Sequence, residues 1–191
     1  MSTRAACIVL LTAAALAGLL VADAISTGVK QQTSDVPRSI RPVWTEVKWP
    51  FPLDQWGFGR AFVCRAADCG GEVNLYLRPK LGFCNCTTGV SDDAELDRVG
   101  DLELLSTTFD GLGDGRPIAV GWMSGRSRPY FVTMRYAPPV TAVAIGFNDK
   151  CDVAVVTVVA EREQLSVAER HAVEFLNSDV LLRWVEKELG L

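Results

Sequence analysis

Cysteine is the residue type whose spacing in this chain constrains chemistry most. The sequence holds six cysteines, and one of them, Cys7, lies inside an apolar N-terminal run. An exported chain normally pairs its cysteines in an oxidising compartment, so the remaining five allow two disulfides and leave one thiol over. These disulfide candidates are Cys64, Cys69, Cys84, Cys86 and Cys151.

Sequence separation favours one pairing of these cysteines. Cys64 and Cys69 are close enough in the chain to meet across a turn. Cys84 and Cys86 are two residues apart, so on a strand they point to the same side, and a bond between them would strain it. One of them therefore reaches a distant partner, for which Cys151 is the candidate. We expect the bonds Cys64–Cys69 and Cys86–Cys151, with Cys84 free.

Three roles are open to the cysteines. As disulfides they stabilise the domain by restricting its unfolded chain. As thiolates, Cys-x4-Cys and Cys-x-Cys supply four zinc ligands, although zinc sites more often use Cys-x2-Cys twice. Dithiol oxidoreductases place Cys-x2-Cys at a helix start, which the spacing of Cys84 and Cys86 does not match. We expect the structural role, and keep a thiol-active envelope protein using Cys84 or Cys86 as the alternative.

The sequence assigns no catalytic residue. His171 is the single histidine and lies at the edge of an apolar helical stripe, so Ser-His-Asp or Cys-His hydrolysis has little support. The loop Asp110–Gly115 leads into a strand, without the Lys-Ser or Lys-Thr of a phosphate loop, and has few oxygen donors for calcium. We expect a plain turn there, no metal and no cofactor, and a binding or accessory protein without catalysis. An enzyme whose site the sequence does not mark is a further alternative.

Arginine and aromatic residues gather between Gly115 and Asn148, where no Asp or Glu occurs. Arg126 and Arg128 are expected at a hairpin tip, and arginine beside aromatics can bind carboxylates, phosphates or peptide groups. The alternative is a hairpin kept soluble by charges that discourage edge pairing. The other arginines are Arg116 and Arg135, and the flanking aromatics are Trp122, Tyr130 and Tyr136. The candidate contact for a small anionic ligand or a partner protein is Arg126, Arg128, Trp122 and Tyr130.

Aromatic residues and prolines are also concentrated in the segment Trp49–Gly57. Two tryptophans within so short a stretch usually belong to a clamp that folds over the core. A recognition patch is the alternative.

Apolar periodicity predicts the elements that position these residues. A two-residue period, β-branched runs and Gly or Pro turns indicate strands. Caps and a helical period indicate a short helix from Ser91-Asp92-Asp93 to Gly100, followed near the C-terminus by two more. The expected strands are 59–65, 71–78, 81–86, 117–124, 130–136, 141–148 and 152–160, and the expected C-terminal helices are 167–176 and 178–189.

These elements predict an α+β domain. It would be an antiparallel β-meander of five to seven strands with the C-terminal helices packed on one face, in two layers. In the strand 141–148, Ala142, Ala144 and Gly146 form a face of small residues. Such a face lets a helix approach closely, and we expect the C-terminal helices to do so.

The N-terminus predicts export. Arg4 precedes the apolar run Ala5–Ala22, and Ala22-Asp23-Ala24 offers small residues to a signal peptidase. We expect a signal peptide over residues 1–24, a flexible linker over 25–44 and a single domain over 45–191. The alternative is an inner-membrane anchor made by residues 5–22, the one membrane contact expected. The net charge of −4 argues against nucleic-acid binding.

Several segments resemble a family of small exported proteins of alpha-proteobacteria with no assigned function. The matching stretches are Trp49–Gly57, Cys64–Cys69, Leu81–Thr87 and Phe175–Asp179. The resemblance covers most of the chain beyond Trp44 and implies a periplasmic location. It implies no ligand, partner or catalytic residue.

Overall fold

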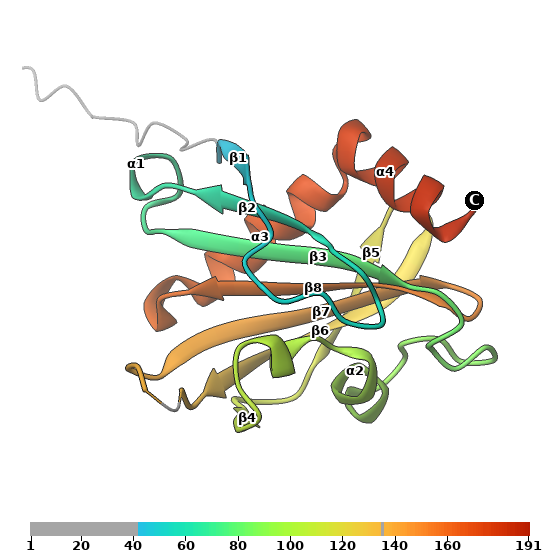
Figure 1. The fold of residues 1–191 in the computed structure, drawn as a ribbon, viewed down its shortest axis with the longest axis horizontal. Coiled ribbons are helices and arrows are strands. Elements are labelled where there is room, and N and C mark those ends of the chain that lie inside the picture. The colour runs from blue at the N-terminus through green and yellow to red at the C-terminus, as the bar shows by residue number, and fades with distance from the viewer. Residues whose placement is uncertain (1–41, 135) are drawn as a thin grey trace, which may run out of the picture. The chain divides into compact units, whose positions relative to one another are not determined.

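The computed structural model describes residues 42–134 and 136–191, in which one antiparallel sheet of eight strands is the main element (Figure 1). The strands lie in the order β1-β2-β3-β8-β7-β6-β4, and β5 pairs with β6 beside β4. Their bounds are β1 Trp44–Val47, β2 Arg60–Cys64, β3 Val73–Lys80, β4 Phe109–Gly111, β5 Arg116–Val120, β6 Met123–Val132, β7 Val140–Asp149 and β8 Asp152–Ala160.

Helices cover both faces of this sheet. Two long helices, α3 (Leu165–Leu176) and α4 (Asp179–Leu189), pack on one face, behind the sheet in Figure 1. The short helix α2 (Asp93–Val99) and the 3-10 turn η1 (Leu102–Leu104) pack on the other face. The remaining helical turns are α1 (Ala66–Cys69) and η2 (Arg162–Gln164). The α+β class, the antiparallel sheet and the C-terminal helices are therefore confirmed, with eight described strands rather than five to seven and a third, smaller layer.

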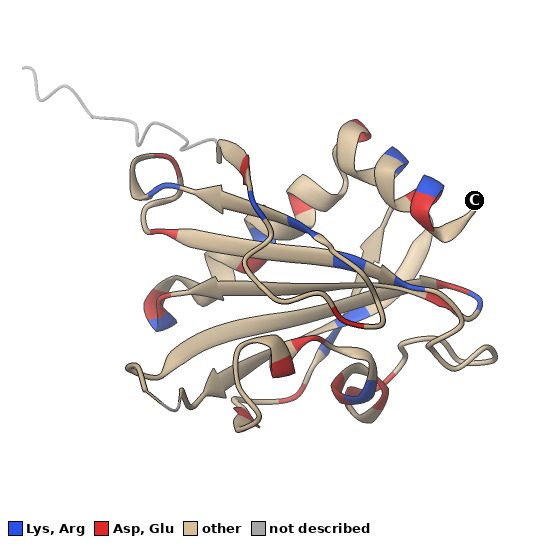
Figure 2. Cartoon of the chain, viewed as in Figure 1, with Lys and Arg blue, Asp and Glu red and all other residues tan. Residues whose placement is uncertain are grey.

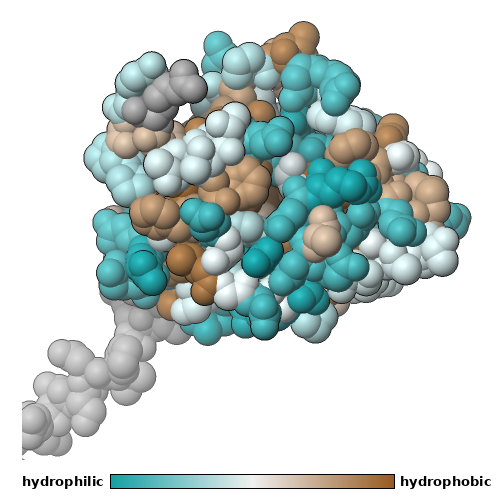
Figure 3. Space-filling view, turned by 90° about the horizontal axis from the view of Figure 1, so that it is seen from below, coloured by the Kyte–Doolittle hydropathy of each residue, from teal (hydrophilic) through white to brown (hydrophobic). Residues whose placement is uncertain are grey.

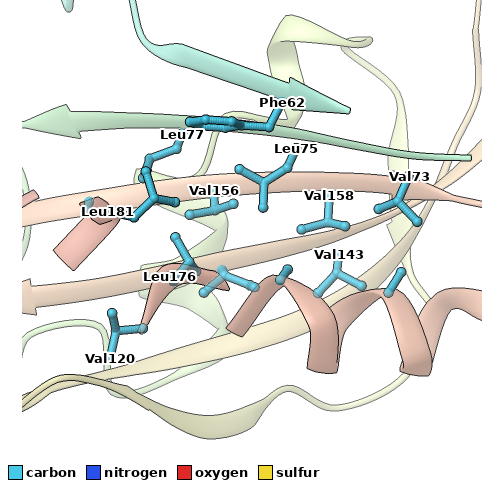
Figure 4. Close-up of a cluster of buried hydrophobic side chains, with 14 of the residues drawn as sticks. Phe62, Val73, Leu75, Leu77, Val120, Val143, Val156, Val158, Leu176 and Leu181 are labelled. Carbon is cyan, nitrogen blue, oxygen red and sulfur yellow. The ribbon is translucent and has the colours of Figure 1, made fainter. Parts of the chain in front are cut away.

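The face under α3 and α4 holds the larger apolar core. Alternate side chains of the central strands, such as Val143 on β7 and Val156 on β8, lie on the side that faces the helices, in one cluster with Leu176 of α3 and Leu181 of α4 (Figure 4). Helical spacing places the apolar residues of α3 and α4 on the sides that meet the sheet. Burying each such side chain contributes about 1.5–3 kcal/mol, so this face supplies most of the driving force for folding.

The opposite face has the small residues that the sequence indicated, but a different helix uses them. A Cβ added to Gly146 would lie 3.2 Å from both Leu96 Cδ1 and Val90 Cγ1, so α2 and the segment before it fill this space. The C-terminal helices instead pack on the side of Val143, so our expectation for them was wrong. The limits of α2 agree with prediction, because the Asp92 carboxylate accepts the Glu95 N–H at 2.8 Å.

Several strands before β7 differ from prediction. Two were not expected: β1 begins at Trp44, the last residue of the expected linker, and β4 includes Asp110 and Gly111 of the expected plain turn. The expected strand 130–136 corresponds only to the last residues of β6, which ends at Val132. The segment 81–86 is made of turns rather than a strand. The expected strand 117–124 is interrupted at Gly121, whose φ of 58° is a left-handed conformation that glycine adopts readily. The chain reverses there between Val120 and Met123, so Arg126 and Arg128 lie in the middle of β6 and not at a hairpin tip.

Both expected disulfides are present, and Cys84 is a free, buried cysteine, as predicted. Cys64–Cys69 joins the end of β2 to α1, and Cys86–Cys151 joins the loop before α2 to the turn between β7 and β8. The predicted signal peptide and Arg135 lie outside the described residues, as does nearly all of the predicted linker. No helix in the described part of the chain has the length and apolar character needed to cross a membrane.

A candidate binding pocket over a buried charge cluster

Two of the arginines named from the sequence, Arg126 and Arg128, contact acids of α2, while Arg116 pairs with Glu169 of α3. Arg126 Nε pairs with Asp93, and Arg128 Nη1 donates to Asp97 Oδ2 at 3.0 Å. Tyr130 is buried and its hydroxyl donates to Asp97 Oδ1. These three residues alternate along β6 and share one side of it, so together they attach α2 to the sheet. Trp122 lies in the β5–β6 turn and is 61% exposed.

These contacts shift the pKa values of Asp93 and Tyr130. Hydrogen bonds from Arg126 and from the Gly115 N–H lower the pKa of Asp93. Burial and the neighbouring Asp97 raise the pKa of Tyr130, whose phenol therefore stays protonated. Because α2 carboxylates already accept from Arg126 and Arg128, this surface is arranged to hold the fold together. A ligand contact there stays a prediction.

A second set of charged residues, which sequence reasoning did not single out, is more deeply buried. Arg78 and Lys80 follow one another on the same side of β3, and Asp101 follows α2; they are 3%, 4% and 6% exposed. Arg78 donates to both oxygens of Asp101, at 2.5 Å from Nε and 2.8 Å from Nη2. We call these three residues the charge cluster. Figure 2 shows basic positions toward the end of β3 and an acidic one in the loop that crosses in front of it.

Lys80 is bonded as an ammonium ion. Its Nζ lies 2.7 Å from Asp101 Oδ1, 2.7 Å from the Val99 carbonyl and 3.2 Å from the Gly100 carbonyl. An ammonium has three N–H groups, and each finds an acceptor here. The carbonyls at the C-terminal end of α2 also favour a positive charge. Burial lowers the pKa of Lys80, and Asp101 opposes that effect.

Arg78 has a second carboxylate partner. Its Nη1 lies 2.8 Å from both carboxylate oxygens of Asp54, which belongs to the loop between β1 and β2. Burial lowers the pKa of Arg78, but Asp101 and Asp54 outweigh it and the net shift is upward. Burial likewise raises the pKa of Asp54, but hydrogen bonds from Arg78 and from the Trp56 N–H leave it below its usual value. The pair is therefore ionised on both sides.

A pocket of about 580 Å³ opens above the charge cluster. Its walls include Trp56 and Phe83, whose ring centroids are 4.5 Å apart, and the Lys80 ammonium lies 5.7 Å and 5.2 Å from them. Arg98 and Glu103 contribute to its lining. Buried charge at the floor and aromatic rings on the wall are features of small-molecule sites, which have volumes of this order. The arrangement can orient a charged ligand, and Lys80 has no free amine to act as a nucleophile.

The sequence contained a signal for this pocket. Arg78 and Lys80 continue the alternation of β3 on the side opposite its apolar residues, so a sheet covered on both faces must bury them. The clamp predicted over Trp49–Gly57 packs on the same side, because Trp49 and Phe51 contact the ring of Tyr76 edge-on. Figure 3 shows the molecule from below. On this side hydrophobic residues gather toward the left and centre, with hydrophilic residues around them.

The thiol alternative has less support from the geometry. Cys84 is 5% exposed and its thiol donates to the Lys150 carbonyl at 3.1 Å. Burial, helped by Glu95 and Asp152, raises its pKa to about 11. A reactive cysteine needs a lowered pKa and access to solvent. Cys86 is bonded to Cys151 and is not a free thiolate, and with both pairs bonded the four zinc ligands considered from the sequence are not available.

Comparisons with known proteins assign no activity. No family model matches the chain, and no curated protein matches it. One solved structure with a detectable likeness is PA94, a protein of unknown function from Pseudomonas aeruginosa. It has 11% sequence identity and a TM-score of 0.38, over 72% of this chain and 81% of that one. We base no argument on a likeness of this size.

Proposed function

We propose that this protein is an exported, non-catalytic binding protein of the periplasm that holds a small ligand in the pocket over Arg78 and Lys80. The observation that carries the proposal is the position of the charge cluster, nearly fully buried and directly beneath an open pocket. Buried ion pairs are weak stabilisers, and apolar residues of similar size often serve a fold as well. Ionisable groups in such a setting are therefore candidates for function.

The location is supported by the cysteines and by the N-terminal sequence. Two disulfides, with the fifth described cysteine buried as a thiol, are the state that an oxidising compartment favours. To test export, the full chain is expressed in a Gram-negative host, and the envelope and cytosolic fractions are compared by intact mass without reductant. A product in the envelope with both bonds, cleaved after Ala24 or retaining residues 1–24 as an anchor, supports export. A reduced, full-length chain in the cytosol contradicts it.

Binding is tested with three probes: the dicarboxylate succinate, inorganic phosphate and the diamine putrescine. The indole N–H of Trp56 reports on the pocket wall in NMR spectra and is assigned with the variant Trp56→Phe. A saturable shift of this signal with any probe, lost in Arg78→Met, supports binding in the pocket. Arg78→Met leaves Asp101 paired with Lys80, so the variant keeps a buried neutral pair. If none of the probes shifts the signal, the proposal of a charged small ligand is wrong.

The thiol-active alternative makes a different prediction. It requires that Cys84 or Cys86 react with iodoacetamide at neutral pH in the folded protein, whereas the raised pKa of Cys84 predicts slow reaction. Rapid alkylation of either residue in native protein would favour the alternative over the binding role.

A further inference from the structure

Asp54, which is not part of the charge cluster, supplies the negative charge that the cluster lacks. The cluster contains two cations, Arg78 and Lys80, and one carboxylate, Asp101, so it carries one net positive charge. The Asp54 side chain is 38% exposed, yet both of its oxygens lie 2.8 Å from Arg78 Nη1. A buried arginine therefore depends for its charge balance on a carboxylate at the protein surface.

The loop that carries Asp54 is fixed at its ends and open in its middle. At one end Trp49 and Phe51 pack on Tyr76, with ring centroids 6.2 Å and 4.8 Å away. At the other end Gly59 lies against the Trp49 ring and the backbone of β3, with no room for a Cβ. Trp56, also in this loop, packs on Phe83, and the residues between Phe51 and Trp56, 52–55, are all exposed. This middle part can leave the pocket while both ends stay packed.

We infer that the pocket takes a small carboxylic acid, and that Asp54 is an internal competitor that must leave Arg78 before the ligand binds. The inference rests on the proposed function and names its ligand class. The position that Asp54 holds, beside Arg78 Nη1, fits a planar group with one negative charge, a group that arginine binds well. Asp101 occupies the Nε side of the Arg78 fork, so Nη1 is the donor that a ligand carboxylate would gain.

The rest of the pocket fits a small organic acid better than inorganic phosphate. Inorganic phosphate would place all of its charge on one tetrahedral group, at a position where Asp54 held a planar group with a single charge, whereas a dicarboxylate divides its two charges between two planar groups. Trp56 and Phe83 offer apolar surface to a carbon chain. Arg98 is 48% exposed and bonds through Nε and Nη2 to Glu95 and through Nη2 to the Phe83 carbonyl. Its Nη1 remains for a second carboxylate.

The test compares two carboxylates of the same pocket by titration with succinate, followed at the Trp56 indole N–H. Asp54→Asn keeps the shape of the side chain but removes its charge and so frees Arg78. We expect this variant to bind succinate about tenfold more tightly than wild type, because less of the protein is held in the competed state. The matched control is Glu103→Gln, which removes a charge from the lining without touching Arg78. Its affinity should change by no more than about twofold.

The outcomes separate this inference from the proposed function. If Asp54→Asn binds no tighter than wild type, or Glu103→Gln gains as much, competition by Asp54 is wrong. If phosphate or putrescine shifts the Trp56 signal and succinate shifts it in neither protein, the ligand class is wrong while the pocket still binds. If no probe acts on any variant, both proposals fall. The double variant Asp54→Asn/Arg78→Met, confirmed as folded by circular dichroism, must lose succinate binding; retention would overturn the inference.

Discussion

The two faces of the sheet are built by different means. The face under α3 and α4 is packed with aliphatic and aromatic side chains, and its charged exception, Glu169, pairs with Arg116 at 2.7 Å toward solvent. The face under α2 has a smaller apolar cluster bordered by ion pairs, including the almost fully buried Arg78 and Asp101. The first face explains why the chain folds. The second holds charges that folding alone does not require, and it is where the pocket opens.

The largest effect is expected from a cavity in the apolar face. Phe147 is fully buried on β7, so Phe147→Ala should lower the free energy of unfolding by about 3–5 kcal/mol. Urea denaturation at neutral pH measures this change. The control is Val180→Ala, since Val180 is 71% exposed on α4 and should matter little. A loss below about 1 kcal/mol for Phe147→Ala would show that this face is not the main source of stability.

The charged face should respond differently to single and combined changes. Asp101→Ala leaves Arg78 and Lys80 buried without their shared partner and should cost about 3–5 kcal/mol. The triple variant Arg78→Met/Lys80→Met/Asp101→Leu removes all three charges and should be neutral or more stable by about 1–4 kcal/mol. Both are compared with wild type by urea denaturation. A triple variant as unstable as Asp101→Ala would mean that the cluster itself stabilises the fold, which would weaken its assignment to binding.

Removing either disulfide should lower the free energy of unfolding by an intermediate amount, and the two losses should differ. Cys86–Cys151 spans 65 residues and holds the loop that leads to α2, while Cys64–Cys69 spans 5. If a disulfide acts by restricting the unfolded chain, its removal costs about 4 kcal/mol for the longer loop and about 2 kcal/mol for the shorter one. Paired Cys→Ser variants, each made in a Cys84→Ser background to prevent new pairing, measure both by urea denaturation. Equal losses would contradict the entropic explanation for this protein.

Sequence periodicity predicted the apolar face better than the charged one. The strand 152–160 and the helix ending at Leu189 were placed within a residue, because each has a clear apolar pattern and Gly190 ends the helix. The disulfide pairing also agrees with the expectation from spacing, although Cys84 and Cys86 lie among turns and not on the strand from which that pairing was argued. These features depend on local pattern or on covalent geometry.

The pocket could not be predicted in the same way, because its parts meet only after folding. Arg78 and Asp54 are 24 residues apart, and Arg78 and Asp101 are 23 apart. The local apolar pattern of the sequence does not predict that the loop from β1 to β2 crosses β3, or that α2 ends above Lys80. Gly121 misled the strand assignment for a related reason, since a two-residue turn leaves the apolar pattern on both sides almost continuous. The signal for this site in the sequence is the pair of charged residues, Arg78 and Lys80, at alternate positions of a strand that the fold covers on both faces.

The smallest expected effect is an acid sensitivity confined to the charged face. Arg126 and the Gly115 N–H lower the pKa of Asp93 from its ordinary value of 3.8. The stabilisation from this pair is therefore complete above that value, where the unfolded carboxyl is also ionised, and is lost as the pH falls through the lower folded value. Asp93→Asn should reduce the stability difference between pH 7 and pH 3 by a few tenths to about 1 kcal/mol. The control is Asp114→Asn, because none of the ion pairs in the described residues includes Asp114. Urea midpoints of the two variants and wild type at both pH values decide the matter. An equal pH dependence in all three would show that α2 is held to the sheet by its apolar contacts alone, and that the ion pairs of β6 add no stability of their own.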